Sequence, residues 1–106
     1  MTATIETKLS EAKRVPRSRI WLQGARLTEH GFNPGAFFQK FWGKGKLTLV
    51  AIGSWTADEL PKADRGKISG NAERPVIDIV GQKVADTFKG THVKARFTQG
   101  RITITD

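Results

Sequence analysis

Two stretches of the chain repeat one order of local features, and this repetition limits the possible folds more than any other property of the sequence. The first is "RIWLQGARLTEHGFNPG", from Arg19 to Gly35, and the second is "RPVIDIVGQKVADTFKG", from Arg74 to Gly90. Each is typical of an apolar strand that ends at a glycine, then a short helix and a further glycine before a hairpin. A helix of fewer than two turns is not stable alone, so the rest of the chain must cover it.

The glycines align the two stretches position by position. The matched pairs are Ile20 and Ile77, Leu22 and Ile79, Gly24 and Gly81, Arg26 and Lys83, Leu27 and Val84, Gly35 and Gly90 after a short deletion, "GKLTL" from Gly45 and "GRITI" from Gly100, and more loosely the lead-in "KRV" at Lys13 and "GKIS" at Gly66. The alternative is that two generic β-α-β stretches look alike by chance. We expect an internal duplication of a unit made of two strands, a short helix and a hairpin.

Each stretch is followed by a hairpin pattern. In "AFFQKFWGKGKLTLVAI" an aromatic-rich segment, a turn and an alternating segment follow one another, and "HVKARFTQGRITITD" repeats that shape. The alternation predicts that Leu47 and Leu49 face one way while Lys46, Thr48 and Val50 face the other. The turn "GKGK" lacks the spacing and the Ser or Thr of a phosphate-binding loop, so we expect only a hairpin turn there.

The helix ends carry signals of their own. Gly31 stands where a left-handed residue ends many helices, and Phe32 is placed to fold back onto the helix. In the second stretch Val80, Val84 and Phe88 recur at four-residue spacing, which predicts one apolar stripe along the second short helix.

We expect one mainly β domain with short helices (α+β) over residues 1–106. It divides into an N-terminal arm (1–12), a first unit (13–52), a linker (53–65) and a second unit (66–106). Each half is too short to bury enough apolar surface alone, and without cysteines it has no disulfide to stabilise it. The predicted common core comprises Leu22, Leu27, Leu47, Leu49, Ile79, Val84, Ile102 and Ile104.

The charge of the chain points to a class of partner. Eighteen Lys and Arg against ten Asp and Glu give a formal net charge of +8. Such a balance favours polyanions, nucleic acid above all. The chain has no cysteine, which excludes disulfides and thiolate zinc sites. Its apolar runs are too short to span a bilayer and its N-terminus lacks an apolar signal core, so we expect a cytoplasmic protein without a membrane partner.

The first stretch also resembles a known family. The pattern G-x-x-L-x-x-x-G-F-x-x-G, carried by Gly24, Leu27, Gly31, Phe32 and Gly35, resembles the SymE-like toxin branch of the AbrB-type swapped-hairpin domains. Members of the broader family usually bind DNA, with two units from two chains interlocked in one small barrel.

The resemblance implies an intrachain pseudo-dimer, because both units lie in one chain; a homodimer is the alternative. It also implies that basic residues before the strand and on the short helix contact DNA, which here are Arg19, Arg26, Arg74 and Lys83. The second unit departs from the pattern, since Phe88 replaces the glycine at the helix end.

Two further groups are candidates for binding. Arg14 and Arg17 lie in the extended basic segment "KRVPRSR", which could track phosphates or could be a solvated edge strand. In "FFQKFW", Phe38 and Trp42 could anchor a base or a protein partner, although core packing is the more common role of such residues.

Catalytic, metal and cofactor sites find no support in the sequence. His30 and His92, the two histidines, have no cysteine or carboxylate at ligand spacing. We therefore expect a non-enzymatic, nucleoid-associated protein that binds double-stranded DNA, or RNA, through backbone contacts. It would act as a regulator or as a SymE-like toxin. The alternatives are a phage or plasmid protein that inhibits a nucleic-acid-handling machine, and an accessory domain of a DNA-modifying enzyme.

Overall fold

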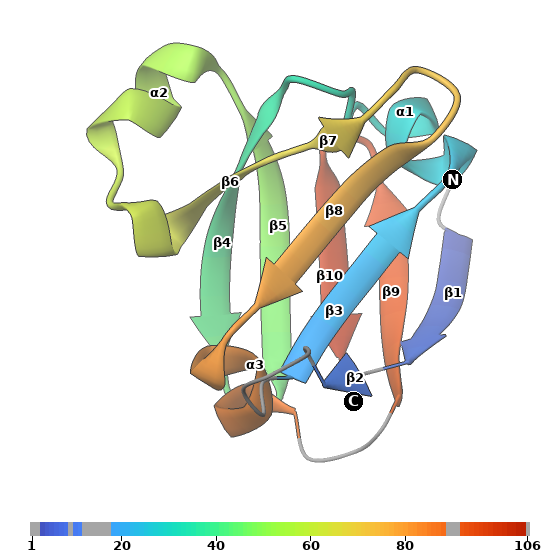
Figure 1. Ribbon diagram of the computed structural model, residues 1–106, viewed down its shortest axis with the longest axis vertical. Helices are drawn as coiled ribbons and strands as arrows, with labels where there is room; N and C mark the ends of the chain where they lie inside the picture. Colours follow the sequence, from blue (N-terminus) through green and yellow to red (C-terminus); the bar gives the residue numbers. More distant parts are fainter. Residues whose placement is uncertain (1–2, 9, 12–17, 89–91, 106) are drawn as a thin grey trace.

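The computed structural model describes residues 3–8, 10–11, 18–88 and 92–105, and its strands form two antiparallel sheets (Figure 1). The elements in chain order are β1 (Ala3–Lys8), β2 (Ser10–Glu11), β3 (Ser18–Gln23), α1 (Ala25–Glu29), β4 (Phe37–Gly43), β5 (Lys46–Ile52), α2 (Ser54–Glu59), η1 (Lys62–Asp64), β6 (Arg65–Lys67), β7 (Ser69–Gly70), β8 (Pro75–Val80), α3 (Gln82–Thr87), β9 (His92–Thr98) and β10 (Arg101–Thr105). The prediction of a mainly β domain with short helices is confirmed.

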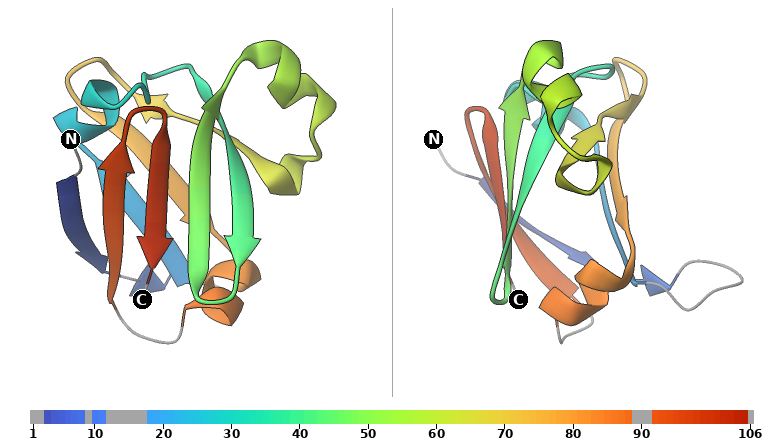
Figure 2. Two further views of the ribbon diagram at one scale, coloured as in Figure 1. Left: turned by 180° about the vertical axis from the view of Figure 1, so that it is seen from behind. Right: turned by 90° about the vertical axis from the view of Figure 1, so that its left-hand side faces the viewer.

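The larger sheet has the strand order β1-β9-β10-β5-β4-β6, and the smaller one has the order β2-β3-β8-β7. The smaller sheet lies against one face of the larger one, and β3 and β8 cross the strands behind them obliquely (Figure 1). Figure 2 (right) shows the two layers edge-on. Within the described residues, no second layer lies against the opposite face of the larger sheet.

The strands form two sheets instead of the single closed barrel that the family resemblance implied. The chain passes between the sheets four times, twice through a short helix (α1 between β3 and β4, and α3 between β8 and β9) and twice at a corner without a helix, between β1 and β2 and between β6 and β7. At the second corner Ile68 is 1 % exposed, its N–H donates to Ala36 O over 2.9 Å, and its carbonyl accepts from Gly35 N at 2.8 Å. The ladder therefore breaks at the corners, where a strand leaves one sheet for the other.

The core fills the space between the sheets, as alternation along the strands predicts. All eight residues predicted for the core are at most 4 % exposed and belong to one buried cluster. The end of α1 also has the predicted geometry. Gly31 has a φ of 92°, and Phe32 N–H donates to Leu27 O at 2.8 Å while Gly31 N–H donates to Thr28 O at 3.2 Å.

One predicted stripe is partly wrong. Val84 and Phe88 are buried, but Val80 is 38 % exposed. The reason is that β8 extends through Val80 and α3 begins only at Gln82, so Val80 alternates outward with the strand.

The strand orders are symmetric between the two halves of the chain. If β1 to β5 are replaced in turn by β6 to β10, and β6 to β10 by β1 to β5, each sheet has the same strand order read from its other end. The register agrees with the glycine-anchored alignment. Trp21 pairs with Asp78 and Thr48 pairs with Thr103, and in both cases the two partners occupy matched positions of the two stretches. Each half therefore meets the other across β3–β8 and across β5–β10.

The register also corrects the lead-in alignment. Ser10 pairs with Arg19, and Ser69 pairs with Val76, which is the residue matched to Arg19. In the same way, Thr7 pairs with Val93, and Gly66 pairs with Phe38, which is the residue matched to Val93. These pairings match "KLS" from Lys8 with "KIS" from Lys67, so the match of "KRV" at Lys13 was wrong.

The expected arm and linker contain regular structure. Residues 1–12 include β1 and β2, which pair with β9 and β3 respectively. Residues 53–65 include α2, η1 and the first residue of β6, and α2 packs against β4 of the larger sheet (Figure 2, left). No helix within the described residues has the length and apolar character needed to cross a membrane.

Candidate nucleic-acid interface

Four cationic side chains gather on the outer face of the larger sheet. Lys46 lies on β5, Lys94 and Arg96 on β9, and Arg101 on β10, and all four are exposed. They point away from the core because Leu47, Ala95 and Ile102, their neighbours in sequence, are buried. We call these four residues, with the threonines between them, the basic face. In Figure 2 (left) no helix or strand of the described chain lies across it.

The register sets the spacing of this face. One row across the sheet runs Lys94, Thr105, Lys46, and the next runs Arg96, Thr103, Thr48, Phe41. Arg101 lies one row further along, opposite Val50. Rows are about 6.8 Å apart and strands about 4.8 Å apart, so the four cations cover roughly 10 Å by 14 Å. At one phosphate per ~3.4 Å of duplex axis, that length matches about four phosphates of one strand.

The electrostatics of the basic face are one-sided. The strands β4, β5, β9 and β10 contain no Asp or Glu. The nearest acidic residue in register is Glu6 of β1, opposite Lys94. Lys94, Arg96, Thr103 and Thr105 also line a small cavity of about 120 Å³. Cations beside hydroxyl groups are the donors that phosphate oxygens accept from.

Of the residues predicted to contact DNA, Arg19 is already engaged within the protein. Its Nε lies 3.1 Å from Asp78 Oδ1, and its guanidinium lies 5.7 Å from the centroid of the Trp21 ring. These contacts lie on the outer face of the smaller sheet, on the opposite side of the molecule from the basic face.

The other predicted cations are not brought into one cluster. Arg26 on α1 and Arg74 before β8 are exposed at one end of the smaller sheet, and Lys83 on α3 is exposed at the other end. Figure 1 shows α1 and α3 at these opposite ends. Arg14 and Arg17 lie outside the described residues.

The two predicted aromatic anchors differ in their surroundings. Phe38 is 2 % exposed and packs in the core over Gly66, so it is not available to a ligand. Trp42 is partly buried against the core, and its Nε1 is buried without a hydrogen-bond partner among the described residues. Lys83 Nζ lies 6.0 Å from the centroid of its ring. The exposed ring of this segment is Phe41, at 48 %, in the same row as Thr48.

Lys40 is the cation of β4 that faces inward, on the same side as Phe38 and Trp42. Desolvation by burial lowers the pKa of Lys40, and nearby Lys83 lowers it further, against an opposing effect of Asp64. On its open side β4 pairs with β6 only from Phe37 to Gln39. An inward lysine just beyond that pairing is typical of an edge strand protected against pairing with another chain.

Of the two histidines, the structure describes the surroundings of His30. His30 Nδ1 lies 2.7 Å from Arg26 O, and its ring lies 5.4 Å from that of Phe97. The side chain of His92 lies outside the described part of the chain. No group of three metal-ligating side chains occurs among the residues that the structure describes.

The basic face was not apparent from the sequence, although strand alternation predicted that Lys46 faces away from Leu47 and Leu49. The missing information was the pairing of β5 with β10, which joins the two hairpins. No protein-family model, curated protein or solved structure matches this chain.

Proposed function

We propose that this protein binds nucleic acid through the basic face, with the backbone of double-stranded DNA as the expected ligand. The observation that carries the proposal is the gathering of Lys46, Lys94, Arg96 and Arg101 on a sheet face that no described helix or strand covers, and whose central strands contain no acidic residue. A concentrated positive patch attracts a polyanion and gains affinity by releasing its counterions.

The proposed contacts are to phosphates and not to base edges. Groove recognition needs an element that enters the major groove, such as a helix or a two-stranded ribbon. The helices α1 and α3 have five and six residues, and both pack against the smaller sheet. A sheet face instead lies against the outside of the duplex, so affinity should vary little with sequence.

We further propose that the chain consists of two fused units that form an intrachain pseudo-dimer. The symmetric strand orders and the pairing of matched positions, such as Thr48 with Thr103, support this origin. They also support the proposed likeness to AbrB-type domains. A regulator or a nucleoid-acting, SymE-like toxin is the role that such a likeness would give a DNA-binding protein.

The test is binding to a duplex oligonucleotide across a salt series. If four phosphates are neutralised, the slope of log K against log salt should be about −3.6. A variant with Lys46, Lys94, Arg96 and Arg101 changed to Gln should lose most of the affinity and most of the slope. The matched control changes Arg26, Lys44, Arg74 and Lys83 to Gln, which removes the same charge from the total of +8.

Two outcomes of this test would contradict the proposal. If the control loses affinity and the basic-face variant does not, the interface includes residues of the control set and does not lie on the basic face. If the unaltered protein binds neither DNA nor RNA at low salt, nucleic-acid binding is wrong. A protein-binding function would then take its place, because Trp55 on α2 is 86 % exposed and exposed tryptophans are frequent binding anchors.

A further inference from the structure

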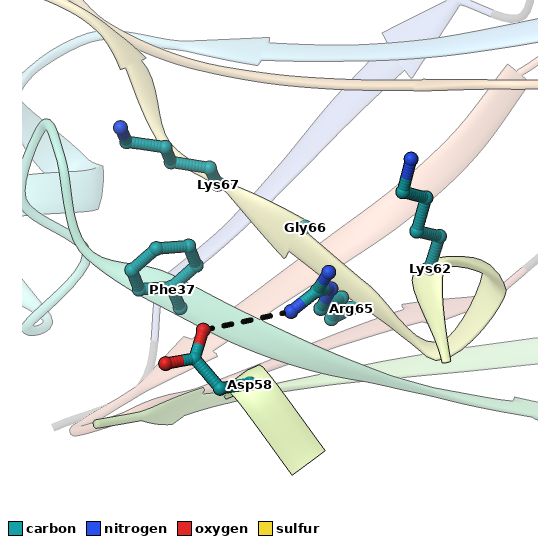
Figure 3. A pocket seen from close by; sticks show the side chains of 6 residues that line it. All are labelled: Phe37, Asp58, Lys62, Arg65, Gly66 and Lys67. Carbon is teal, nitrogen blue, oxygen red and sulfur yellow. Dashed lines mark ion pairs between the residues drawn. The ribbon is translucent and has the colours of Figure 1, made fainter. Parts of the chain in front are cut away.

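A second cavity lies at the β6 edge of the larger sheet, apart from the basic face. It has a volume of about 350 Å³ and is lined by Phe37, Asp58, Lys62, Arg65, Gly66 and Lys67. We call it the edge pocket. Its lining comes from β4, β6, η1 and α2, so the segment that joins the two halves builds one of its walls (Figure 3).

The edge pocket carries an excess of positive charge. Lys62 and Lys67 extend to the same side of β6, with Gly66 between them (Figure 3). Arg65 is held by α2, since its Nη1 donates to Ala57 O at 2.7 Å and lies 3.8 Å from Asp58 Oδ1. Three cations against one carboxylate favour an anionic ligand.

The edge pocket also has a planar apolar wall. The Phe37 ring is partly exposed, and Lys67 Nζ lies 5.8 Å from its centroid. Gly66 adds no side chain between the lysines, and a Cβ at this position would overlap the Phe38 ring in the core. A side chain at position 66 would point into the core, because Gly66 pairs with the buried Phe38 and not with Phe37.

We propose that the edge pocket binds a phosphorylated nucleotide, either free or as the phosphorylated end of a nucleic-acid strand. The base would stack on Phe37, and the phosphate would lie between Lys62 and Lys67. Aromatic rings stack on any base, and lysines bind phosphate as point charges. The volume is within the range of small-ligand sites.

The terminal-nucleotide form of this inference rests on the proposed function. Phe37 is the register partner of Ile52 on β5, the strand that carries Lys46 of the basic face. The edge pocket and the basic face thus share neighbouring strands, and a strand bound on the basic face could place its end in the edge pocket.

The first experiment measures binding of adenosine monophosphate, adenosine and inorganic phosphate to the full chain, by calorimetry and by NMR with the Gly66 amide as reporter. We expect the monophosphate to bind at least tenfold more tightly than either fragment. Phe37→Leu should reduce binding of the monophosphate to the level of phosphate. The double variant Lys62→Gln with Lys67→Gln should reduce it to the level of adenosine. The matched control, Arg26→Gln with Lys44→Gln, should bind the monophosphate like the unaltered chain.

The second experiment compares oligonucleotides of one sequence that carry a 5′-phosphate, a 3′-phosphate or no terminal phosphate. We expect a preference of about fivefold or more for one phosphorylated end, lost in the Lys62 and Lys67 variant. Equal binding of phosphate and monophosphate would overturn the inference. So would the absence of both monophosphate binding and end preference, while duplex binding through the basic face would still stand. Monophosphate binding without any oligonucleotide binding would support the edge pocket and overturn the proposed function.

Discussion

Thr48 and Thr103 lie opposite each other on β5 and β10, at the centre of the larger sheet, and they are also matched positions of the two repeated stretches. Trp21 and Asp78 stand in the same relation in the smaller sheet. In both sheets, the central pair of strands joins one half of the chain to the other, and residues at matched positions pair across it. Each half thus completes its sheets with strands of the other.

A chain cut near Ala63 should not give a folded monomer. In the fragment 1–63, β1, β3 and β5 lose their partners β9, β8 and β10. The fragment should be unfolded, or should form a homodimer in which a second copy replaces the missing half. Circular dichroism and light scattering distinguish these states. Mixing it with the fragment 64–106 should restore the folded chain, and a folded monomeric 1–63 would contradict the shared core.

Arg19 and Arg96 should differ in their effect on nucleic-acid binding. Arg96→Gln should weaken duplex binding on all sequences alike and reduce the salt slope by about 1. Arg19→Gln should change affinity less than twofold, because Asp78 already holds this guanidinium on the other side of the molecule. It should lower the free energy of unfolding by only about 0.5 kcal/mol, since the pair is partly exposed. A larger loss of affinity for Arg19→Gln would return the interface to the residues predicted from the family resemblance.

Lys40→Met should stabilise the protein near neutral pH by about 1 kcal/mol, because it removes a charge from a partly buried site. The pKa of Lys40 in the folded state lies below the reference value of 10.5, chiefly through desolvation. At pH values between the folded-state pKa of Lys40 and 10.5, the unfolded chain binds more protons than the folded chain. The free energy of unfolding of the unaltered protein therefore rises with pH in this range. The advantage of Lys40→Met should therefore shrink as pH rises toward 10.5.

Thermal unfolding over a pH series measures this effect, with Lys44→Met at the exposed turn as the matched control. If the difference in unfolding temperature between Lys40→Met and the unaltered chain does not vary with pH, the lowered pKa of Lys40 is contradicted. The same variant should aggregate more readily, because the inward charge beside the open edge of β4 is gone.

Gly66→Ala should lower the free energy of unfolding by about 2 kcal/mol, since the added methyl group would overlap the Phe38 ring. Gly53→Ala is the matched control, because nothing lies within 4 Å of its Cβ position. Denaturant unfolding gives both values. If Phe38→Leu relieves the cost of Gly66→Ala in a double-mutant cycle, the contact is confirmed as its cause.

Local patterns were enough to predict the hairpins, the end of α1 and the eight core residues. Strand alternation and the left-handed Gly31 depend on near neighbours along the chain, which the sequence displays directly. Val80 was misassigned because a four-residue spacing at the junction of a strand and a helix suits either element.

The basic face could not be predicted in the same way. Lys46 and Arg101 are 55 positions apart and meet only through the β5–β10 register, which depends on which hairpin edges join. The edge pocket depends on how α2 and η1 pack against β4 and β6, which linker composition does not specify. Long-range pairing, and not side-chain chemistry, limited the prediction of the candidate sites.

In the row Thr4, Arg96, Thr103, Thr48, Phe41, a cation lies on one side of the central threonine pair and a ring on the other, although Arg96 and Phe41 occupy matched positions of the two halves. A two-fold scaffold with identical ends would accept a strand in either polarity with equal free energy. Here the two polarities are inequivalent, because a reversed strand would exchange what meets the cation and what meets the ring. On the proposed interface, divergence of matched pairs such as Arg96 and Phe41, or Lys94 and Gln39, would thus make a symmetric platform directional, so that it would distinguish the 5′ side of a bound strand from its 3′ side.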